Sequence, residues 1–452
     1  MIYLIITLLF SVISYAYLAK LPISGNILHI RFSKNSNVLV ALITGLFFSQ
    51  MVMYRPGSNI SPYAYSHGLL EQILVLGKTV SNWMSLALVG YCVFRIIIGS
   101  QKFKLGKNFI IMYSCVLLTI LTGVVQSNSL VSGLSEGVKY LLPFLIFGAI
   151  MSLNCLKIGP FITKLLTYTN VIMIIQVLLC KVFTGKFAAS TYYWEFQEEY
   201  FGFYNHPHNF TGLLGILTIW CIFNINRKNH SFFYILLAMI NIGLMYISGS
   251  RSYVYSLIIS IGYILLVSLF DSKLKRMRKY AITLFTLMFF FGGAFISNLG
   301  SNRVTGDVLS GRGLRWLTDI QYYLTSTTLA QKFLGGGFGF VNEVNLKLSG
   351  VYINSLNIFI DVLLNNGLIG LFLLIIAYGI LFSYFVKEGS KQFSITIVLF
   401  FVISSVVTNF ITYQVVLIYM VLVLHAIMYM SKIERQKLPK IMEHRVYRNY
   451  IA

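Results

Sequence analysis

The chain has 452 residues, of which 57% are hydrophobic and only 11% are charged, and its mean hydropathy is +0.77. These values exclude an ordinary soluble globular protein and indicate an integral membrane protein. The formal net charge of +22 does not require a nucleic-acid partner, because cytoplasmic Lys and Arg residues anchor membrane spans against anionic lipid headgroups.

Apolar runs of bilayer-spanning length recur along the whole sequence. They predict an all-α, polytopic membrane protein with about 12–13 transmembrane helices in one integral membrane domain over residues 1–452. The first run has no basic residue ahead of it, so we do not expect a cleavable signal peptide. The predicted spans are Ile2–Ala19, Val38–Tyr54, Trp83–Ile98, Asn108–Val125, Val138–Leu153, Phe161–Phe183, Phe210–Phe223, Phe232–Ser248, Tyr253–Phe270, Ala281–Ser297, Gly367–Val386, Ser394–Phe410 and Gln414–Met430.

The distribution of charge among the predicted loops indicates their sides. If the loop after the first span is cytoplasmic and the sides alternate, most Lys and Arg residues fall inside and most acids fall outside. The strongest cytoplasmic markers are the loop over residues 95–107, the segment over residues 271–279 and the basic tail over residues 431–452. We therefore expect the N-terminus outside and the C-terminus inside.

Polar residues gather on the predicted outer side. Glu136 lies in one outer segment, and the outer loop over residues 184–209 carries Trp194, Tyr204 and His208. Glu136 and His208 are candidate general bases, since both are titratable groups near the outer surface. A hydrogen-bonded structural role is the alternative for a histidine at a membrane edge. Trp194 and Tyr204 are candidate sugar-binding residues.

The sequence SGSRSY over residues 248–253 joins two predicted spans with almost no loop. Arg251 is thereby held at the membrane interface among small neighbours that leave room for a phosphate. A guanidinium group is always charged and binds phosphate through two parallel hydrogen bonds. The alternative is an interfacial anchor that extends to lipid headgroups.

The largest outer loop covers residues 298–355 and contains the sequence SGRGLRW over residues 310–316. In a helix that starts near Gly311, the residues Arg312, Arg315, Trp316 and Asp319 share one face. That face predicts an arginine grip on a diphosphate, with Trp316 stacked on a sugar. The alternative is a surface helix in which Arg315 and Asp319 form a solvated ion pair.

Two further patterns close this loop. The glycine-rich sequence over residues 335–339 predicts a turn that folds the loop back over the membrane, not a nucleotide site. Residues 354–370 predict a helix that enters the membrane at an angle, with Asn354, Asn357, Asp361 and Asn365 on one stripe. The stripe is a candidate for binding sugar hydroxyls, with Asn357 as its representative, or for polar contacts between helices.

No metal or cofactor is expected. The five cysteines lie in or at the ends of predicted spans without paired spacing, and no sequence motif resembles a metal site.

Four features in this order resemble the superfamily of O-antigen polymerases and O-antigen ligases (Wzy and WaaL proteins). They are an S-x-S-R hairpin, a long outer loop with G-R-x-x-x-W, a glycine-rich turn, and an N-x9-G-L-I-G segment that enters a span. The detailed resemblance covers residues 248–371. It implies a GT-C-type glycosyltransferase in the bacterial inner membrane, with its active site and the loop over residues 298–355 facing the periplasm. It assigns the hairpin arginine to Arg251 and the loop arginine to Arg312.

The resemblance also implies the partners. Undecaprenyl diphosphate-linked oligosaccharide is the expected donor and acceptor, and a separate chain-length regulator is a candidate partner. Ligases carry a histidine before the asparagine of the N-x9-G segment, whereas Leu356 precedes Asn357 here. This departure favours O-antigen polymerase. The alternatives are an O-antigen ligase that transfers glycan to lipid A-core and a lipid-linked oligosaccharide flippase or exporter.

Overall fold

A computed structural model describes residues 34–49, 74–75, 78–99, 106–153, 155–185, 192–194, 197–199, 207–227, 231–248, 250–271, 282, 286 and 312–451. The described chain is helical apart from two short antiparallel hairpins, β1 (Leu74–Val75) with β2 (Lys78–Thr79) and β3 (Tyr192–Trp194) with β4 (Gln197–Glu199). The helices are α2 (Lys34–Ser49), α4 (Val80–Gly99), α5 (Lys107–Val125), α6 (Leu130–Ser152), α7 (Cys155–Thr184), α8 (Pro207–Asn226), α9 (Ser231–Ile247), α10 (Arg251–Phe270), α12 (Arg312–Thr325), α13 (Leu329–Leu334), α14 (Phe340–Ser349), α15 (Ile358–Glu388), α16 (Lys391–Val407), the 3-10 turn η2 (Phe410–Thr412) and α17 (Gln414–Ile451).

The helices of the described chain match the predicted spans. Seven of them, in α5, α6, α7, α8, α10, α15 and α17, are long and apolar enough to cross a membrane, and shorter apolar helices lie in α2, α4, α9 and α16. This arrangement supports a polytopic membrane protein. The predicted spans Ile2–Ala19 and Ala281–Ser297 lie outside the described residues.

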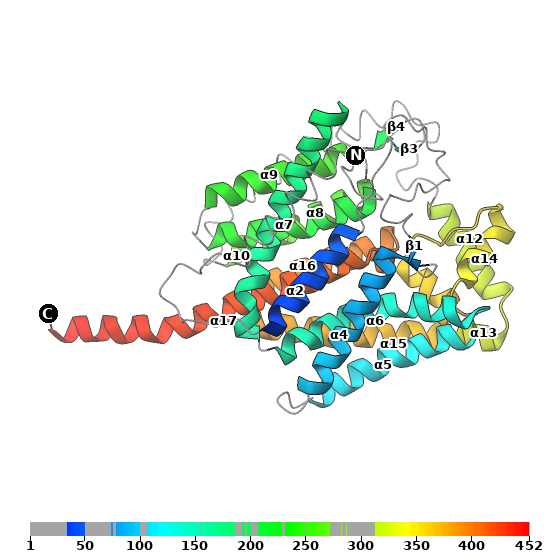
Figure 1. Cartoon of the computed structure of the whole chain (residues 1–452), viewed down its shortest axis with the longest axis horizontal. Helices are drawn as coiled ribbons and strands as arrows, with labels where there is room; N and C mark the ends of the chain where they lie inside the picture. Colours follow the sequence, from blue (N-terminus) through cyan, green and yellow to red (C-terminus); the bar gives the residue numbers. More distant parts are fainter. Residues whose placement is uncertain are drawn as a thin grey trace.

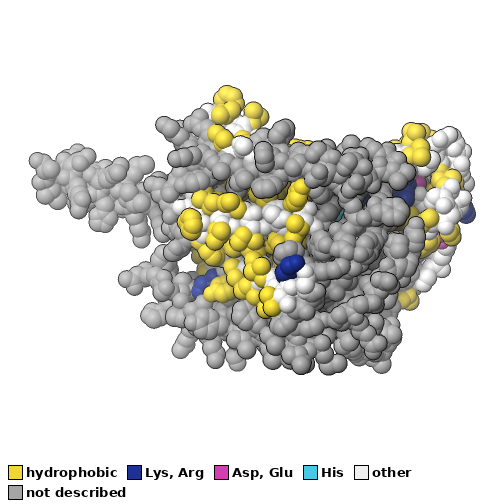
Figure 2. Space-filling model, turned by 90° about the horizontal axis from the view of Figure 1, so that it is seen from above, with side chains coloured by type: hydrophobic (Ala, Val, Ile, Leu, Met, Phe, Trp, Pro, Cys, Tyr) yellow, Lys and Arg dark blue, Asp and Glu magenta, His cyan; other side chains and the backbone are white. Residues whose placement is uncertain are grey.

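Two helices form the centre of the bundle. In α8 and α17, 94% and 83% of the apolar window is buried, whereas only 33% of the window in α5 is buried. Large apolar side chains such as Leu117, Leu118 and Leu121 of α5 are about half exposed, as expected for a helix that faces lipid. In the space-filling view, the described middle of the visible face is mainly hydrophobic (Figure 2).

The polar loop helices form a cap at one end of the bundle. The helices α12, α13 and α14 lie together there, while the C-terminal part of α17 extends from the opposite end (Figure 1). At that opposite end, Lys432 of α17 binds Glu388 at 3.1 Å and Gln392 donates to Asp271 at 3.1 Å. The segments that we expect on the cytoplasmic side therefore meet at one end.

The glycine-rich turn inserts into a break in α15. Gly367 has a left-handed backbone (φ 70°) that interrupts the helix, so carbonyl groups before it lose their helical partners. Gly336 N–H donates to the Leu364 carbonyl at 2.9 Å, and Gly337 N–H donates to the Asn365 carbonyl at 2.9 Å. A side chain at Gly337 would collide with the Gln126 backbone, so this close approach requires glycine. The predicted turn is confirmed.

The helix predicted to begin at residue 354 begins later in the structure. It begins only at Ile358, because the Asn357 side chain caps it by accepting from Phe359 N–H at 2.9 Å. Asn354 lies before the cap and accepts from Leu356 N–H at 3.1 Å. Only Asp361 and Asn365 of the predicted polar stripe therefore lie on the helix.

Candidate functional site

Arg312 ties the cap to the membrane helices. It is the first residue of α12, and its Nη1 donates to Ser252 Oγ at 2.9 Å and to the Val407 carbonyl. Val407 ends α16, where a cation is favoured by the negative end of the helix dipole. The two predicted motifs, the hairpin and the arginine-bearing loop helix, are therefore in direct contact.

His208 lies against the same hairpin. Its Nδ1 is 2.6 Å from Ser250 Oγ, and its ring packs edge-on against Tyr253 and Tyr413, with centroids 5.7 and 5.8 Å apart. Ser250 occupies the N-cap position of α10, but its hydroxyl contacts His208 instead of capping the first turn. We call His208, Ser250, Ser252 and Arg312 the hairpin cluster.

Three helices begin in the hairpin cluster. The helix α8 begins at Pro207, α10 at Arg251 and α12 at Arg312. Each helix N-terminus carries a partial positive charge and N–H groups without helical acceptors. Together with the Arg312 guanidinium, they make this region suited to an anion such as a phosphate. The backbone of Arg251 belongs to this region, while its side chain lies outside the described residues.

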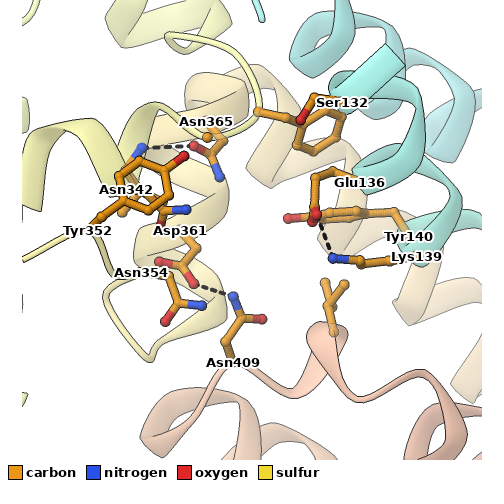
Figure 3. A pocket seen from close by; sticks show the side chains of 14 residues that line it. Ser132, Glu136, Lys139, Tyr140, Asn342, Tyr352, Asn354, Asp361, Asn365 and Asn409 are labelled. Atoms are coloured by element: carbon orange, nitrogen blue, oxygen red, sulfur yellow. Dashed lines mark hydrogen bonds and ion pairs between the residues drawn. The ribbon is translucent and has the colours of Figure 1, made fainter. Parts of the chain in front are cut away.

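A polar cavity of about 250 Å³ lies between the cap and α6. On one wall are side chains of α6, and facing them are side chains from α14, α15 and the segment between them (Figure 3). Asn409 contributes from the segment that precedes η2. The lining residues are Ser132, Glu136, Lys139, Tyr140, Phe338, Gly339, Val341, Asn342, Tyr352, Asn354, Asp361, Asn365, Asn409 and Ile411.

Two carboxyl groups face this cavity. Glu136 forms an ion pair with Lys139, one turn along α6, at 2.5 Å. Asp361 is 1% exposed, and its oxygens accept from Ser355 N–H at 2.8 Å and from the Asn409 amide. Both carboxyl groups are thus fixed in position by protein partners.

The hairpin cluster and the cavity are neighbours along the chain. Val407 accepts from Arg312, and Asn409, two residues later, lines the cavity. Two residues of extended backbone span at most about 7 Å. An anionic group at the cluster and a polar group in the cavity can therefore belong to one bound complex.

Two further residues predicted to bind substrate, Trp316 and Asn357, do not line the cavity. Trp316 donates its indole N–H to the Ser355 carbonyl at 2.8 Å and packs beside Val341 and Ile360. Asn357 is buried and caps α15. The hydrogen-bonding groups of both side chains are therefore used in contacts within the protein.

Arg315 and Asp319 do not form the solvated surface ion pair that was the alternative prediction, because Asp319 is not exposed to solvent. Asp319 is fully buried, and its carboxylate accepts from the Asn345 amide at 3.5 Å. Burial raises the pKa of Asp319, while the nearby polar side chains of Ser355 and Asn345 and the charge of Arg315 lower it in part. The face of α12 that carries these residues is packed against the rest of the protein.

Some predictions concern residues that the structure does not describe. Tyr204 lies outside the described residues, and of Trp194 only the backbone, in β3, is described. Their assignment to sugar binding stays a prediction. Within the described ranges, no group of three or more His, Cys, Asp or Glu side chains is close enough to hold a metal ion.

Several cavity residues were not singled out from the sequence. Asn342, Tyr352 and Asn409 come from separate parts of the chain, and only the folded cap brings them together. Asp361 had a clear signal, because an acid inside a long apolar run is rare unless it has a function. Its partner Asn409 lies inside the predicted span Ser394–Phe410, where a polar side chain is a weaker indication of function than an acid.

Comparison of the sequence with protein-family models and with curated proteins found no match. The likeness of the four motifs to O-antigen polymerases and ligases therefore stays an expectation from the sequence.

Proposed function

We propose that this chain is an O-antigen polymerase, or a polymerase of a related surface polysaccharide, acting at the periplasmic face of the bacterial inner membrane. It joins undecaprenyl diphosphate-linked repeat units by glycosyl transfer. The observation that carries the proposal is the convergence of Arg312, the Ser248–Ser252 hairpin and three helix N-termini in the hairpin cluster. A positive region of this kind, in a multi-span protein, suits the diphosphate headgroup of a lipid-linked substrate.

The reaction needs charge stabilisation more than it needs a reactive side chain. A sugar hydroxyl of the acceptor attacks the anomeric carbon of the donor, and the bond to the lipid diphosphate breaks. Negative charge grows on the departing diphosphate as the bond lengthens. Arg312 and the N–H groups of α10 and α12 are already oriented in the cluster, so they stabilise this charge without reorganising.

Deletion of the gene separates this proposal from its two alternatives. Loss of a polymerase leaves lipid A-core that carries single repeat units. Loss of a ligase leaves long polymer on the lipid carrier, and loss of a flippase or exporter leaves no units on the outer face. Lipopolysaccharide gels, together with analysis of the lipid-linked pool, distinguish these outcomes. A deletion strain with its normal ladder of long chains would contradict the polymerase proposal.

Replacing the arginines tests the diphosphate role directly. We expect Arg312→Lys and Arg251→Lys each to reduce long chains by about 100-fold, because an ammonium group cannot form the paired bonds of a guanidinium. The ladder on a lipopolysaccharide gel is the measurement, with membrane levels checked by immunoblot. Arg227→Lys is the matched control, since Arg227 binds Glu434 at the opposite end of the bundle. Undiminished ladders for both arginine variants would remove the diphosphate role.

A further inference from the structure

The polar lining of the cavity is rich in amides. Asn342, Asn354, Asn365 and Asn409 all line it, and each carboxamide offers both donors and an acceptor. A phosphate accepts hydrogen bonds and is best matched by donors alone, whereas a sugar hydroxyl both donates and accepts. The mixed lining therefore fits hydroxyl groups better than it fits a phosphate.

One of these amides has an unmet requirement. The Oδ1 atom of Asn342 is buried, and no donor among the described residues reaches it. By contrast, the Oδ1 atom of Asn365 accepts from Val341 N–H at 3.1 Å. A buried polar atom without a hydrogen-bond partner costs free energy. A bound ligand that donates a hydrogen bond to Asn342 Oδ1 would remove this cost.

The cavity size limits what it can hold. Its volume of about 250 Å³ is just below the range of roughly 300–1,000 Å³ that is usual for ligand sites. Tyr140 and Phe338, whose ring centroids are 5.3 Å apart, give one wall an aromatic surface. A single sugar ring fits this combination of size, aromatic surface and amides.

The two carboxyl groups of the cavity are not equivalent. Glu136 forms an ion pair with Lys139, so the ammonium group occupies one of its oxygens. Asp361 is bound by a backbone N–H and by the Asn409 amide, which orient both of its oxygens without neutralising the charge. Asp361 is therefore the better oriented proton acceptor at the cavity wall (Figure 3).

We infer that the cavity is the subsite for the terminal sugar of the acceptor and that Asp361 accepts the proton of the attacking hydroxyl. This inference rests on the proposed function. The hydroxyl oxygen forms a bond to the anomeric carbon of the donor, and its proton passes to the Asp361 carboxylate. The bond between the anomeric carbon and the diphosphate breaks, and the electron pair leaves with undecaprenyl diphosphate near the hairpin cluster.

The first test uses the full-length protein in nanodiscs with purified undecaprenyl diphosphate-linked repeat units from the source strain. We expect Asp361→Asn to lower the rate of polymer formation by about 100-fold or more, the usual contribution of general base catalysis. The double variant Asp361→Asn/Asn409→Asp restores an acid–amide pair but moves the carboxylate to the neighbouring segment. It should stay inactive, and recovery of polymer formation would show that the pair only holds the fold.

Two further variants complete the design. Asn342→Ala removes a cavity amide, and we expect the KM for the lipid-linked unit to rise about fivefold to tenfold with kcat nearly unchanged. Asp271→Asn is the control, because Asp271 is an acid at the opposite end of the bundle, where Gln392 donates to it, and the variant should keep normal polymer formation. An unchanged KM for Asn342→Ala would contradict the sugar subsite.

The outcomes separate this inference from the proposed function. If the wild-type protein makes no polymer from the purified units, the proposed function fails and the inference fails with it. If the wild-type protein makes polymer and Asp361→Asn makes it equally well, only the inference fails.

Discussion

Asp319 is a residue whose charge works against the folded state. Burial in the cap raises the pKa of its carboxyl group above the ordinary value, and the opposing effects of Ser355, Asn345 and Arg315 are smaller. The protonated form is therefore favoured on folding. The stability that this group contributes is fully present below its unfolded pKa and is lost as the pH rises through the folded pKa.

Asp319→Asn should remove this pH dependence. We expect the variant to be similar in stability to the wild type near pH 4 and more stable than the wild type near pH 8, since ~4 is the unfolded pKa of an aspartate. Thermal unfolding of the purified full-length proteins in detergent, measured across that range, checks the difference. A gap that shrinks or reverses with rising pH would contradict the assignment.

Leu356 also shows what a single position contributes. It has a left-handed backbone (φ 57°), which is unusual for a bulky residue. The conformation is held by the Asn354 side chain, which accepts from Leu356 N–H, and by the Asn357 cap that follows. The chain therefore makes a strained turn here without a titratable side chain at its centre.

Among the elements, α15 depends most on a single residue. Gly367 has a backbone conformation (φ 70°, ψ −175°) that is almost restricted to glycine, and a Cβ atom there would lie 2.3 Å from the Phe333 carbonyl oxygen. The break that it creates provides the carbonyl acceptors for the glycine-rich turn. The cap is therefore joined to α15 by main-chain bonds as well as side chains.

Gly367→Ala should destabilise the protein strongly. The backbone strain costs roughly 1–3 kcal/mol, and the collision with the Phe333 carbonyl adds to it. Gly379→Ala in the same helix is the matched control, because a Cβ atom there meets no other atom within 4 Å and alanine favours a helix. Thermal unfolding in detergent compares the two variants. Equal melting temperatures for the two would contradict the role of the break.

The spans could be predicted from the sequence, but the joint between the cap and α15 could not. Apolar runs such as Gln414–Met430 have few alternatives to a membrane helix, and they match described helices. The insertion of the glycine-rich turn depends on carbonyl groups of Leu364 and Asn365 that a helical pattern treats as already paired. Nothing in the local sequence marks those two acceptors.

At the scale of the whole molecule, the charged segments that the structure describes lie at two opposite ends of the bundle. Arg227, Glu388 and Lys432 lie at the end from which α17 extends, whereas α12–α14 lie at the other (Figure 1). This arrangement agrees with the alternation of sides derived from charge. The direction of each end relative to the membrane stays a prediction.

Cysteine labelling checks that direction. We expect Ser326→Cys, at the exposed turn after α12, to react with a membrane-impermeant maleimide in intact cells with a permeable outer membrane. Lys391→Cys, at the exposed start of α16, should react only after the inner membrane is opened. Described native cysteines such as Cys92 and Cys221 are buried, so their background reaction is low. The reverse pattern would invert the predicted orientation.

The sequence predicts the residues of the hairpin cluster, but only the fold brings the residues of the cavity together. The motifs around Arg251 and Arg312 are short patterns that resemble a known family, and their contact through Ser252 follows from the fold. The cavity joins residues from α6, α14, α15 and the segment before η2, far apart in sequence. Long-range packing between polar helix ends leaves little periodic signal, so this part could not be predicted.

The main-chain bonds of the glycine-rich turn also have a consequence for biosynthesis. Gly336 and Gly337 leave the ribosome before Leu364 and Asn365, the residues whose carbonyl groups they bind. During translation, the cap therefore cannot complete its fold until α15, the hydrophobic helix that follows it, has been inserted. Assembly of the cap is thus coupled to the synthesis and insertion of α15, and a chain that terminates before α15 has no finished cap.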